Sequence, residues 1–403
     1  MHFLFAWRYF RGKYAFQAIQ MIAWVSVLAI AIGTAALITV LSVSNGFTEV
    51  VKGLYSDFYA DIRVTSSHSK FYKVSVDQWG QIQKIKGVVA VSKVVENRAL
   101  LVRGEKQAVV MIKGVDSAYT SINQVAHYLK RGIFEMGNKE QPHVVLGIGV
   151  EQKLGLFPEP LGDTMQLYAV SRSGKSLTSL DQLNSLSVTQ TGAFSIQQEF
   201  DEQYVFTHFA FAQYLLDIDS AEVSAIELAI LPSEEKNVVK NLLQILGNQV
   251  QVQNKYQQNI DLYKIMQMEK WIIFFILGVI MIVASFNLVG ALTMLVLEKK
   301  KDIHVLHSMG ASAWDVQKIF LLLSGLMAFI GAFIGGALAS LFCFLQMQFH
   351  FIKLQGNSFV IDYYPIKPMW EDYLAIIGLV VFIALLAGWI PARKAARQLH
   401  EKI

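Results

Sequence analysis

The sequence predicts an α-helical membrane protein with four transmembrane helices and a large α+β domain inserted between the first and the second helix. Composition is the first observation, since 54% of the 403 residues are hydrophobic and only 16% are charged, against about 25% charged residues in a typical soluble domain. The second is a set of four apolar stretches, each long enough to cross the roughly 30 Å hydrocarbon core of a bilayer. The third is a long polar region between the first two stretches.

The four apolar stretches give the bounds of the predicted transmembrane helices. We expect these helices at residues 19–43, 271–297, 319–345 and 373–390. The first stretch is too long for the core of a secretion signal and lacks a convincing cleavage site, so we interpret it as a retained anchor.

Small residues in these stretches indicate close helix packing. Gly331, Gly335 and Gly336 have the small-xxx-small spacing that lets two helix backbones approach each other. A patch of small residues also follows Gly33 in the first stretch. Packing within one chain explains the pattern more simply than a seam between two chains.

Basic residues predict the orientation of the helices. Lys and Arg gather before the first stretch, after the second and after the fourth. Short flanks rich in Lys and Arg are typical of the cytoplasmic side of a membrane. The segments predicted to be cytoplasmic are therefore 1–18, 298–318 and 391–403. The domain 44–270 and the short loop 346–372 then lie on the other side.

The large outer domain has mixed α and β patterns. Alternating polarity at residues 61–66 and 223–231 predicts strands, and helical spacing at 76–85 and 233–246 predicts helices. These flanking parts have the pattern of two split βαβ halves that share one sheet. We expect the middle, residues 116–219, to form an inserted β-rich subdomain.

Several function classes are disfavoured by the sequence. The single cysteine, Cys343, leaves no disulfide framework and no cysteine-based metal site. A net charge of +4 is too small to indicate nucleic-acid binding. The nearest approach to a phosphate-binding loop, Gly174-Lys175-Ser176, has Ala169 where the required upstream glycine would stand. We predict no catalytic residue and no metal site, so the protein is not expected to be an enzyme and any nucleotide would be hydrolysed by a partner.

The charged segment after the second stretch predicts a short amphipathic helix that ends at Gly310. Its candidate apolar contact residues are Ile303, Val305, Leu306 and Met309. By charge alone, the segment would be an ordinary interfacial loop that only sets the topology. His304 and His307 stand three residues apart, but no third ligand is in view, so we interpret them as polar docking residues rather than metal ligands.

Three segments resemble a known family. Residues 37–47, Leu-Ile-Thr-Val-Leu-Ser-Val-Ser-Asn-Gly-Phe, are similar to the end of the first span in lipoprotein-releasing permeases of the Lol system. Residues 294–311 match a second pattern of the family. In this pattern the end of a transmembrane helix is followed by an acidic residue, basic residues, Asp-Ile and a Leu-x-x-x-Gly-Ala turn. Residues 390–397, Ile-Pro-Ala-Arg-Lys-Ala-Ala-Arg, look like the family's last span end. The resemblance to the FtsX-like permease superfamily, and to its Lol branch, covers essentially the whole chain.

The resemblance implies a subunit of an ATP-driven complex in the bacterial inner membrane, with the large domain in the periplasm. Two permease chains, identical or homologous, would bind a separate cytoplasmic ATPase dimer that carries the ATP and Mg, so this chain would hold no cofactor. The family extracts lipoproteins from the outer leaflet of the inner membrane, hands them to a periplasmic carrier and works by mechanical transmission from the ATPase. The expected partners include membrane lipid and exclude nucleic acid.

The resemblance also implies site residues. The ATPase-coupling candidates are Glu298, Lys299, Lys300, Lys301, Asp302, Ile303, His304, Leu306, Met309, Gly310 and Ala311. The substrate-path candidates are Leu37, Val40, Asn45, Phe47, Phe274, Phe275, Met281, Ile282 and Phe286, although any of these apolar side chains would also suit a plain lipid-facing surface. The carrier-hook candidates are Ser173, Lys175, Leu177 and Leu180, in a region that lacks the proline of the family's hook hairpin.

Two alternatives stay open. One is a MacB-like permease that exports small molecules or toxins, a branch that commonly carries its ATPase on the same chain. The other is an FtsX-like regulator of a cell-wall hydrolase, whose outer domain is usually smaller. A neighbouring gene for a lone ATPase and a periplasmic carrier in the same genome would favour the lipoprotein-releasing function.

Overall fold

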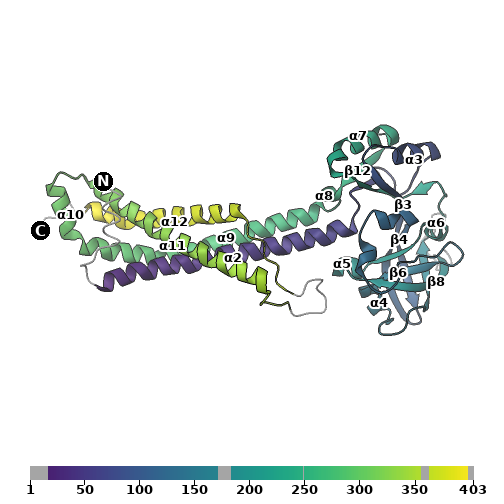
Figure 1. Ribbon diagram of the computed structural model, residues 1–403, viewed down its shortest axis with the longest axis horizontal. Helices are drawn as coiled ribbons and strands as arrows, with labels where there is room; N and C mark the ends of the chain where they lie inside the picture. The colour runs from purple at the N-terminus through teal and green to yellow at the C-terminus, as the bar shows by residue number, and fades with distance from the viewer. Residues whose placement is uncertain (1–16, 171–182, 248, 355–362, 398–403) are drawn as a thin grey trace. The chain divides into compact units, whose positions relative to one another are not determined.

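The computed structural model describes residues 17–170, 183–247, 249–354 and 363–397, and its chain divides into two units (Figure 1). Of the described residues, the helical unit comprises 17–50, 264–354 and 363–397, and the sheet unit comprises 51–170, 183–247 and 249–263. Helices α2 (Gln17–Phe58) and α9 (Ile260–Glu298) contribute residues to both units.

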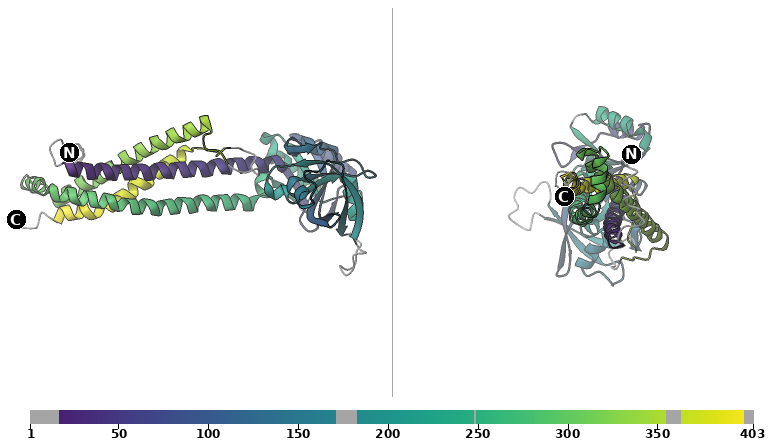
Figure 2. Two further views of the ribbon diagram at one scale, coloured as in Figure 1. Left: turned by 90° about the horizontal axis from the view of Figure 1, so that it is seen from below. Right: turned by 90° about the vertical axis from the view of Figure 1, so that its left-hand side faces the viewer.

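The helical unit is built from four long helices: α2, α9, α11 (Ala313–Phe349) and α12 (Trp370–Arg397), which lie side by side (Figures 1 and 2). Within the described residues, these four helices are long and apolar enough to cross a membrane. The four apolar helices predicted from the sequence are therefore present, in the predicted order. Both α2 and α9 extend beyond the apolar stretches that predicted them, because each helix continues through polar residues.

Glycines bring α11 into close contact with α2. A Cβ atom on Gly335 would lie 2.3 Å from the Ala31 carbonyl oxygen, and one on Gly331 would lie 2.9 Å from the Val27 carbonyl oxygen. Side chains do not approach backbone atoms this closely, so only glycine allows the two backbones to meet. These glycines pack helices of the same chain, as the sequence indicated.

The sheet unit contains a ten-stranded sheet in the order β12-β1-β11-β3-β4-β9-β6-β8-β5, with β7 pairing with β3 and β8. The strands are β1 (Ile62–Ser66), β3 (Val88–Arg103), β4 (Lys106–Val115), β5 (Leu129–Gly132), β6 (His143–Gly147), β7 (Thr164–Val170), β8 (Leu183–Phe194), β9 (Tyr204–His208), β11 (Ala225–Ile230) and β12 (Val250–Asn254). Two short strands, β2 (Tyr72–Lys73) and β10 (Glu222–Val223), pair separately.

Strands from the two flanking parts of the outer domain lie together in this sheet, since β1 pairs with both β11 and β12. Helices α3 (Val76–Gln83) and α7 (Glu235–Leu246) cover one face, where Ile82 and Leu242 are fully buried. A capping box between Ser75 and Gln78 fixes the start of α3.

The middle of the outer domain continues the same sheet. Strand β9 pairs in parallel with β4, and β7 pairs with β3, so backbone hydrogen bonds join the middle strands to the flanking ones. Short helices α4 (Ile148–Lys153), α5 (Gln198–Asp201) and α6 (Phe209–Leu216), with the 3-10 turns η1 (Ser117–Ser121) and η2 (Val125–Tyr128), connect these strands.

An aromatic layer covers the second face of the central strands. Phe58, at the end of α2, stacks on Phe200 with ring centroids 3.9 Å apart, and Tyr119 and Phe206 belong to the same buried cluster. The last turns of α2 are therefore a part of the core of the sheet unit. Two further short helices belong to this unit: α8 (Lys255–Gln258) follows β12, and η4 (Pro232–Glu234) precedes α7.

Candidate functional site

The predicted coupling segment, residues 298–318, contains a short helix, a glycine turn and the start of α11. The helix, α10, runs from Lys300–Ser308. Gly310 follows with φ +91°, a left-handed conformation that favours glycine. Ser312 then caps α11, because its side chain accepts a hydrogen bond from the backbone N–H of Asp315. A turn with a defined glycine conformation thus separates α10 from the next apolar helix.

The apolar side chains of α10 lie in two different environments, the core of the helical unit and the surface. Ile303 is fully buried in the core of the helical unit, so this contact candidate packs the helix against its own chain. Val305 and Met309 are 59% and 79% exposed, and Leu306 is half-buried. The apolar surface of α10 that is accessible therefore consists of Val305, Leu306 and Met309, without Ile303.

Polar side chains flank these three residues along the sequence of the segment. Lys299 Nζ lies 3.4 Å from the Asp302 carboxylate, and Lys301 is exposed. The His307 ring nitrogen Nδ1 lies 3.2 Å from the Ala311 carbonyl oxygen. Among the described residues there is no group of three or more His, Cys, Asp or Glu side chains that could hold a metal ion. The remaining coupling candidates, Glu298, Lys300, His304 and Gly310, lie on or beside α10.

An apolar groove of about 470 Å³ lies between α9 and α12. Four substrate-path candidates line its α9 wall: Phe274, Phe275, Ile282 and Phe286. Leu379, Phe382 and Leu386 line its α12 wall. Ser285, the only hydroxyl side chain among its lining residues in the described helices, donates a 2.6 Å hydrogen bond to the Ile282 carbonyl oxygen. The groove therefore offers apolar contacts and an already paired hydroxyl.

The other substrate-path candidates lie elsewhere in the helical unit. Leu37 and Met281 are each 2% exposed and belong to its core. Val40 is 42% exposed on α2 and is not part of the groove lining. Phe47 packs edge-on against Tyr364, with ring centroids 5.7 Å apart. Only part of the predicted path is thus brought together, because a hydrophobic pattern does not show which side of a fully apolar helix faces its neighbours.

Asn45 belongs instead to a polar cluster that was not predicted. Its side-chain amide donates to the Asp372 carboxylate, and Lys270 Nζ lies 2.9 Å from the other Asp372 oxygen. The cluster joins one residue from each of α2, α9 and α12. The loop before α12 is held to α2 as well, since Lys367 N donates a 2.9 Å hydrogen bond to the Ser42 carbonyl oxygen.

The carrier-hook candidates Ser173, Lys175, Leu177 and Leu180 lie outside the described residues. The strands on either side of them, β7 and β8, pair in antiparallel register from Thr164 opposite Thr189 to Val170 opposite Leu183.

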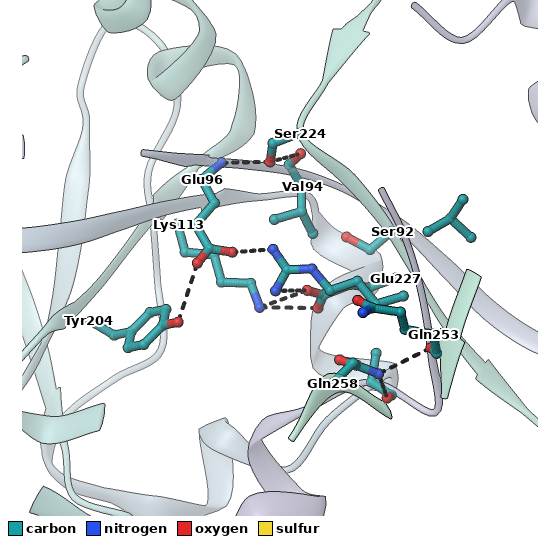
Figure 3. A network of polar contacts seen from close by, with 12 residues as sticks. Ser92, Val94, Glu96, Lys113, Tyr204, Ser224, Glu227, Gln253 and Gln258 are labelled. Carbon is teal, nitrogen blue, oxygen red and sulfur yellow. Dashed lines mark hydrogen bonds and ion pairs between the residues drawn. The ribbon is translucent and has the colours of Figure 1, made fainter. Parts of the chain in front are cut away.

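A network of buried charges occupies one face of the sheet unit and was also not predicted (Figure 3). Lys113 on β4 and Glu227 on β11 are 0% and 1% exposed, and Lys113 Nζ lies 2.9 Å from Glu227 Oε1. Arg63 on β1 donates to Glu96 on β3 at 2.6 Å and lies 3.6 Å from Glu227. Two cations therefore neutralise two carboxylates, one pair fully buried and the other partly exposed.

The strand register places these four charges together. Arg63 stands opposite Glu227 across β1 and β11, and Glu96 stands opposite Lys113 across β3 and β4. Directly opposed side chains on one sheet face are close enough to interact. The signal in the sequence is a single charge within an apolar strand, as in Val-Val-Met-Ile-Lys-Gly-Val around Lys113.

Aromatic side chains complete the network. Lys113 Nζ lies 5.5 Å from the Phe58 ring centroid and 5.0 Å from that of Tyr119, distances at which a cation is attracted to the ring. The Tyr204 hydroxyl donates to Glu96 at 3.2 Å. Burial raises the pKa of the Glu96 carboxyl, but the charges of Arg63 and Lys113 lower it by more, so its pKa lies below the ordinary value.

Two family models match the chain. The MacB-like periplasmic core domain matches residues 23–244, more than half of the chain, and the FtsX-like permease C-terminal model matches residues 274–399. The chain therefore belongs to the FtsX-like permeases with a MacB-like periplasmic core domain. Within that class, it is similar to lipoprotein-releasing system transmembrane proteins, which confirms the resemblance that the three sequence motifs carried.

The similarity to these relatives extends along nearly the whole of both chains. LolE from Haemophilus influenzae is 26% identical, over 98% of this chain and 97% of that protein. LolC from Neisseria meningitidis is 26% identical over 98% of both. LolC from Xylella fastidiosa is 24% identical over 97% of this chain and 95% of that protein. Among solved structures, the periplasmic region of MacB from Actinobacillus actinomycetemcomitans has a TM-score of 0.38 and 14% identity, over 53% of this chain and 98% of that chain.

Proposed function

We propose that this chain is the permease subunit of an ATP-driven complex that releases lipoproteins from the outer leaflet of the bacterial inner membrane. The observation that carries the proposal is the similarity to LolE and LolC along nearly the whole of both chains. The four apolar helices would anchor the chain as a multi-pass protein of the inner membrane. The sheet unit would lie in the periplasm, where a released lipoprotein is handed to a carrier.

The topology of the proposal follows the basic flanks. Residues 1–18, 298–318 and 391–403 would be cytoplasmic, and residues 44–270 and 346–372 periplasmic. The last turns of α12 carry Lys394 and Arg397, which suits the cytoplasmic side of a membrane. In this arrangement α10 is the helix that a cytoplasmic partner can reach between two transmembrane helices.

A separate ATPase dimer would dock on α10. The exposed side chains of Val305 and Met309, with Leu306 beside them, would fill an apolar pocket of the ATPase, and the charges from Glu298 to Asp302 would surround that contact. ATP and Mg would bind to the ATPase alone. A second permease chain, identical or homologous, would take the other ATPase subunit, and the helices α2 and α9 would transmit the motion.

The groove between α9 and α12 would hold acyl chains of the lipoprotein. Its apolar walls match a hydrocarbon chain, but moving such a chain from lipid into the groove gains little, because lipid tails are as apolar as the groove. The costly step is the removal of the acyl chains into water, at about 0.8 kcal/mol for each CH₂ group. ATP hydrolysis by the partner would drive that step. The hook residues 173–180 remain the candidate contact for the carrier.

A photocrosslinking amino acid at Phe286 tests the substrate assignment. Phe286 lines the groove and is 67% exposed, whereas Phe329 on α11 is 55% exposed and is not one of the groove residues. We expect a lipoprotein adduct at position 286 and at least tenfold less adduct at position 329. Equal adducts at both positions, or none at 286 while lipoproteins are being sorted, would contradict the proposed path.

A further inference from the structure

A polar pocket of about 490 Å³ opens on the sheet unit beside the buried charge network. Its polar walls come from β1, from the loop that follows β1, from β3, and from the residue before β11. They consist of Arg63, Thr65, Ser69, Lys70, Glu96, Arg98 and Ser224. The fold thus brings three cations and three hydroxyl side chains to one cavity.

The pocket has an excess of positive charge. Glu96 is the only carboxylate among its lining residues in the described chain, and it already accepts hydrogen bonds from Arg63 and Tyr204. Within the described residues, neither Lys70 nor Arg98 forms an ion pair with a carboxylate; Lys70 Nζ donates to the Asn97 side-chain oxygen. Two cationic groups therefore remain for a ligand.

Holding these cations together costs free energy in the empty pocket. Burial lowers the pKa of the Lys70 ammonium, and the Arg98 charge lowers it further, against the opposing effect of Glu96. Like charges that share one cavity repel each other, and an anion placed between them reverses the sign of that interaction. The arrangement is thus better suited to an occupied pocket than to an empty one.

We propose that this pocket binds a phosphate group, carried either by a small soluble molecule or by a phospholipid headgroup. Arg98 would form a forked contact with two phosphate oxygens, and Lys70 would act as a compact point charge. The hydroxyl of Thr65 would donate to a remaining oxygen, whereas the Ser69 hydroxyl already donates to the Phe71 carbonyl oxygen. The donors come from two strands and a loop, an arrangement that fits a tetrahedral group with several acceptor oxygens better than a planar carboxylate. The proposal does not depend on the transport function.

Arg63 connects this pocket with the buried network. Its guanidinium group contacts Glu96 and Glu227, and the same residue lines the pocket. A bound phosphate would share Arg63 with these carboxylates. Lys70 and Arg98 are the better positions for a test, because both are exposed and their loss leaves the buried ion pairs in place.

The test is calorimetric titration of the purified full-length protein in detergent at fixed ionic strength. The probes are inorganic phosphate, sn-glycerol 3-phosphate and dihexanoylphosphatidylglycerol below its micelle concentration. The double variant Lys70→Ala/Arg98→Ala removes the two available cations. The matched control is Lys236→Ala/Lys240→Ala, which removes two exposed charges from α7 and so changes the net charge equally.

We expect saturable binding of at least one probe, weakened at least tenfold in Lys70→Ala/Arg98→Ala and less than twofold in the control. Equal affinity for glycerol phosphate and the lipid would identify a soluble phosphate ester as sufficient, and a preference for the lipid would identify a headgroup. The absence of saturable binding to every probe would overturn the proposal. Equal weakening in both double variants would overturn it too, because the effect would then be one of net charge.

Discussion

Lys113 Nζ lies 2.9 Å from the Glu227 carboxylate, and both side chains are buried in the sheet unit beneath the aromatic end of α2. A charge at such a place is tolerated only because it is paired, since the removal of one partner leaves the other uncompensated. The pair therefore marks the position at which a single substitution should do the most damage to the sheet unit.

Replacing Lys113 with Met should destabilise the sheet unit by about 3 kcal/mol, the lower end of the range for broken buried pairs, since Arg63 still lies 3.6 Å from Glu227. For a unit of this size, that corresponds to a fall in melting temperature of roughly 6–12 °C. Thermal unfolding of the full-length protein, monitored by limited proteolysis, measures this fall in melting temperature. Lys236→Met, on the exposed side of α7, is the control, and an equal effect of the two substitutions would show that the buried pair is not important for stability.

The stability of the sheet unit should fall in acid partly through Glu96. Because the charges of Arg63 and Lys113 outweigh burial and hold its pKa below the ordinary value, ionised Glu96 stabilises the fold above the unfolded-state pKa of about 4.3. That contribution is lost as the pH falls through the lower, folded-state pKa. Glu96→Gln should therefore flatten the pH dependence of the melting temperature below about pH 4. Glu105→Gln, on the exposed β3–β4 turn, should have the same pH dependence of the melting temperature as the wild type. If the wild type and both variants show identical pH dependence, Glu96 is not the group responsible.

Gly335→Ala should loosen the packing of α11 on α2. The new methyl group would meet the Ala31 backbone, which cannot move aside without shifting α2, and overpacking of this kind costs about 1–3 kcal/mol. Gly290→Ala on α9, where no atom beyond the neighbouring turns of its own helix lies within 4 Å of the new group, should be neutral or stabilising by up to about 1 kcal/mol. The buried thiol of Cys343 supplies the measurement, because a thiol-reactive dye labels it only when the helical unit opens. A melting temperature that is the same in both variants would show that the glycine contact is not needed.

Asp372→Ala should destabilise the helical unit by roughly 2 kcal/mol, since it removes the charged acceptor of both Asn45 and Lys270. The neighbouring Glu371 is exposed, so Glu371→Ala is a matched control with the same loss of charge. The Cys343 labelling assay again gives the melting temperature. If the two variants have the same melting temperature, the polar cluster does not stabilise the helical unit.

Val305→Asp/Met309→Asp should weaken the capture of the partner ATPase at least tenfold, or about 1.4 kcal/mol, because a charged residue replaces each exposed apolar contact. Ser308→Asp adds a negative charge to the same helix without removing apolar surface and should weaken capture less than twofold. Copurification of the ATPase, with Cys343 labelling to show that the permease stays folded, measures both. Undiminished capture by the double variant would show that the ATPase docks elsewhere.

The sequence predicted the apolar helices well and their contacts poorly. A run of apolar residues is visible without any partner, so the four helices and their order could be read directly. The ends of α2 and α9 could not, because both helices continue through polar residues beyond their apolar stretches. Ile303 was assigned to the contact surface of α10, but it is buried, since the pattern alone does not say which apolar residue faces the protein's own core.

The polar contacts could not be predicted from the sequence, for a different reason. Asn45 and Asp372 are 327 positions apart, and Lys113 and Glu227 are 114 apart. Each is an ordinary residue in its own segment, and only the fold makes it a partner. A charge within an apolar strand, as at Lys113, was the one local signal that a buried pair must exist.

The central claim is that this chain releases lipoproteins, and depletion of the protein in its own cells tests it most directly. After expression is shut off, the inner and outer membranes are separated and outer-membrane lipoproteins are quantified in each, with a rescue by the wild-type gene and by the Val305→Asp/Met309→Asp variant. We predict that lipoproteins accumulate in the inner membrane, and that the wild-type gene restores their sorting while the variant does not. Normal sorting after depletion, in cells that have no second permease of this class, would contradict the proposed function.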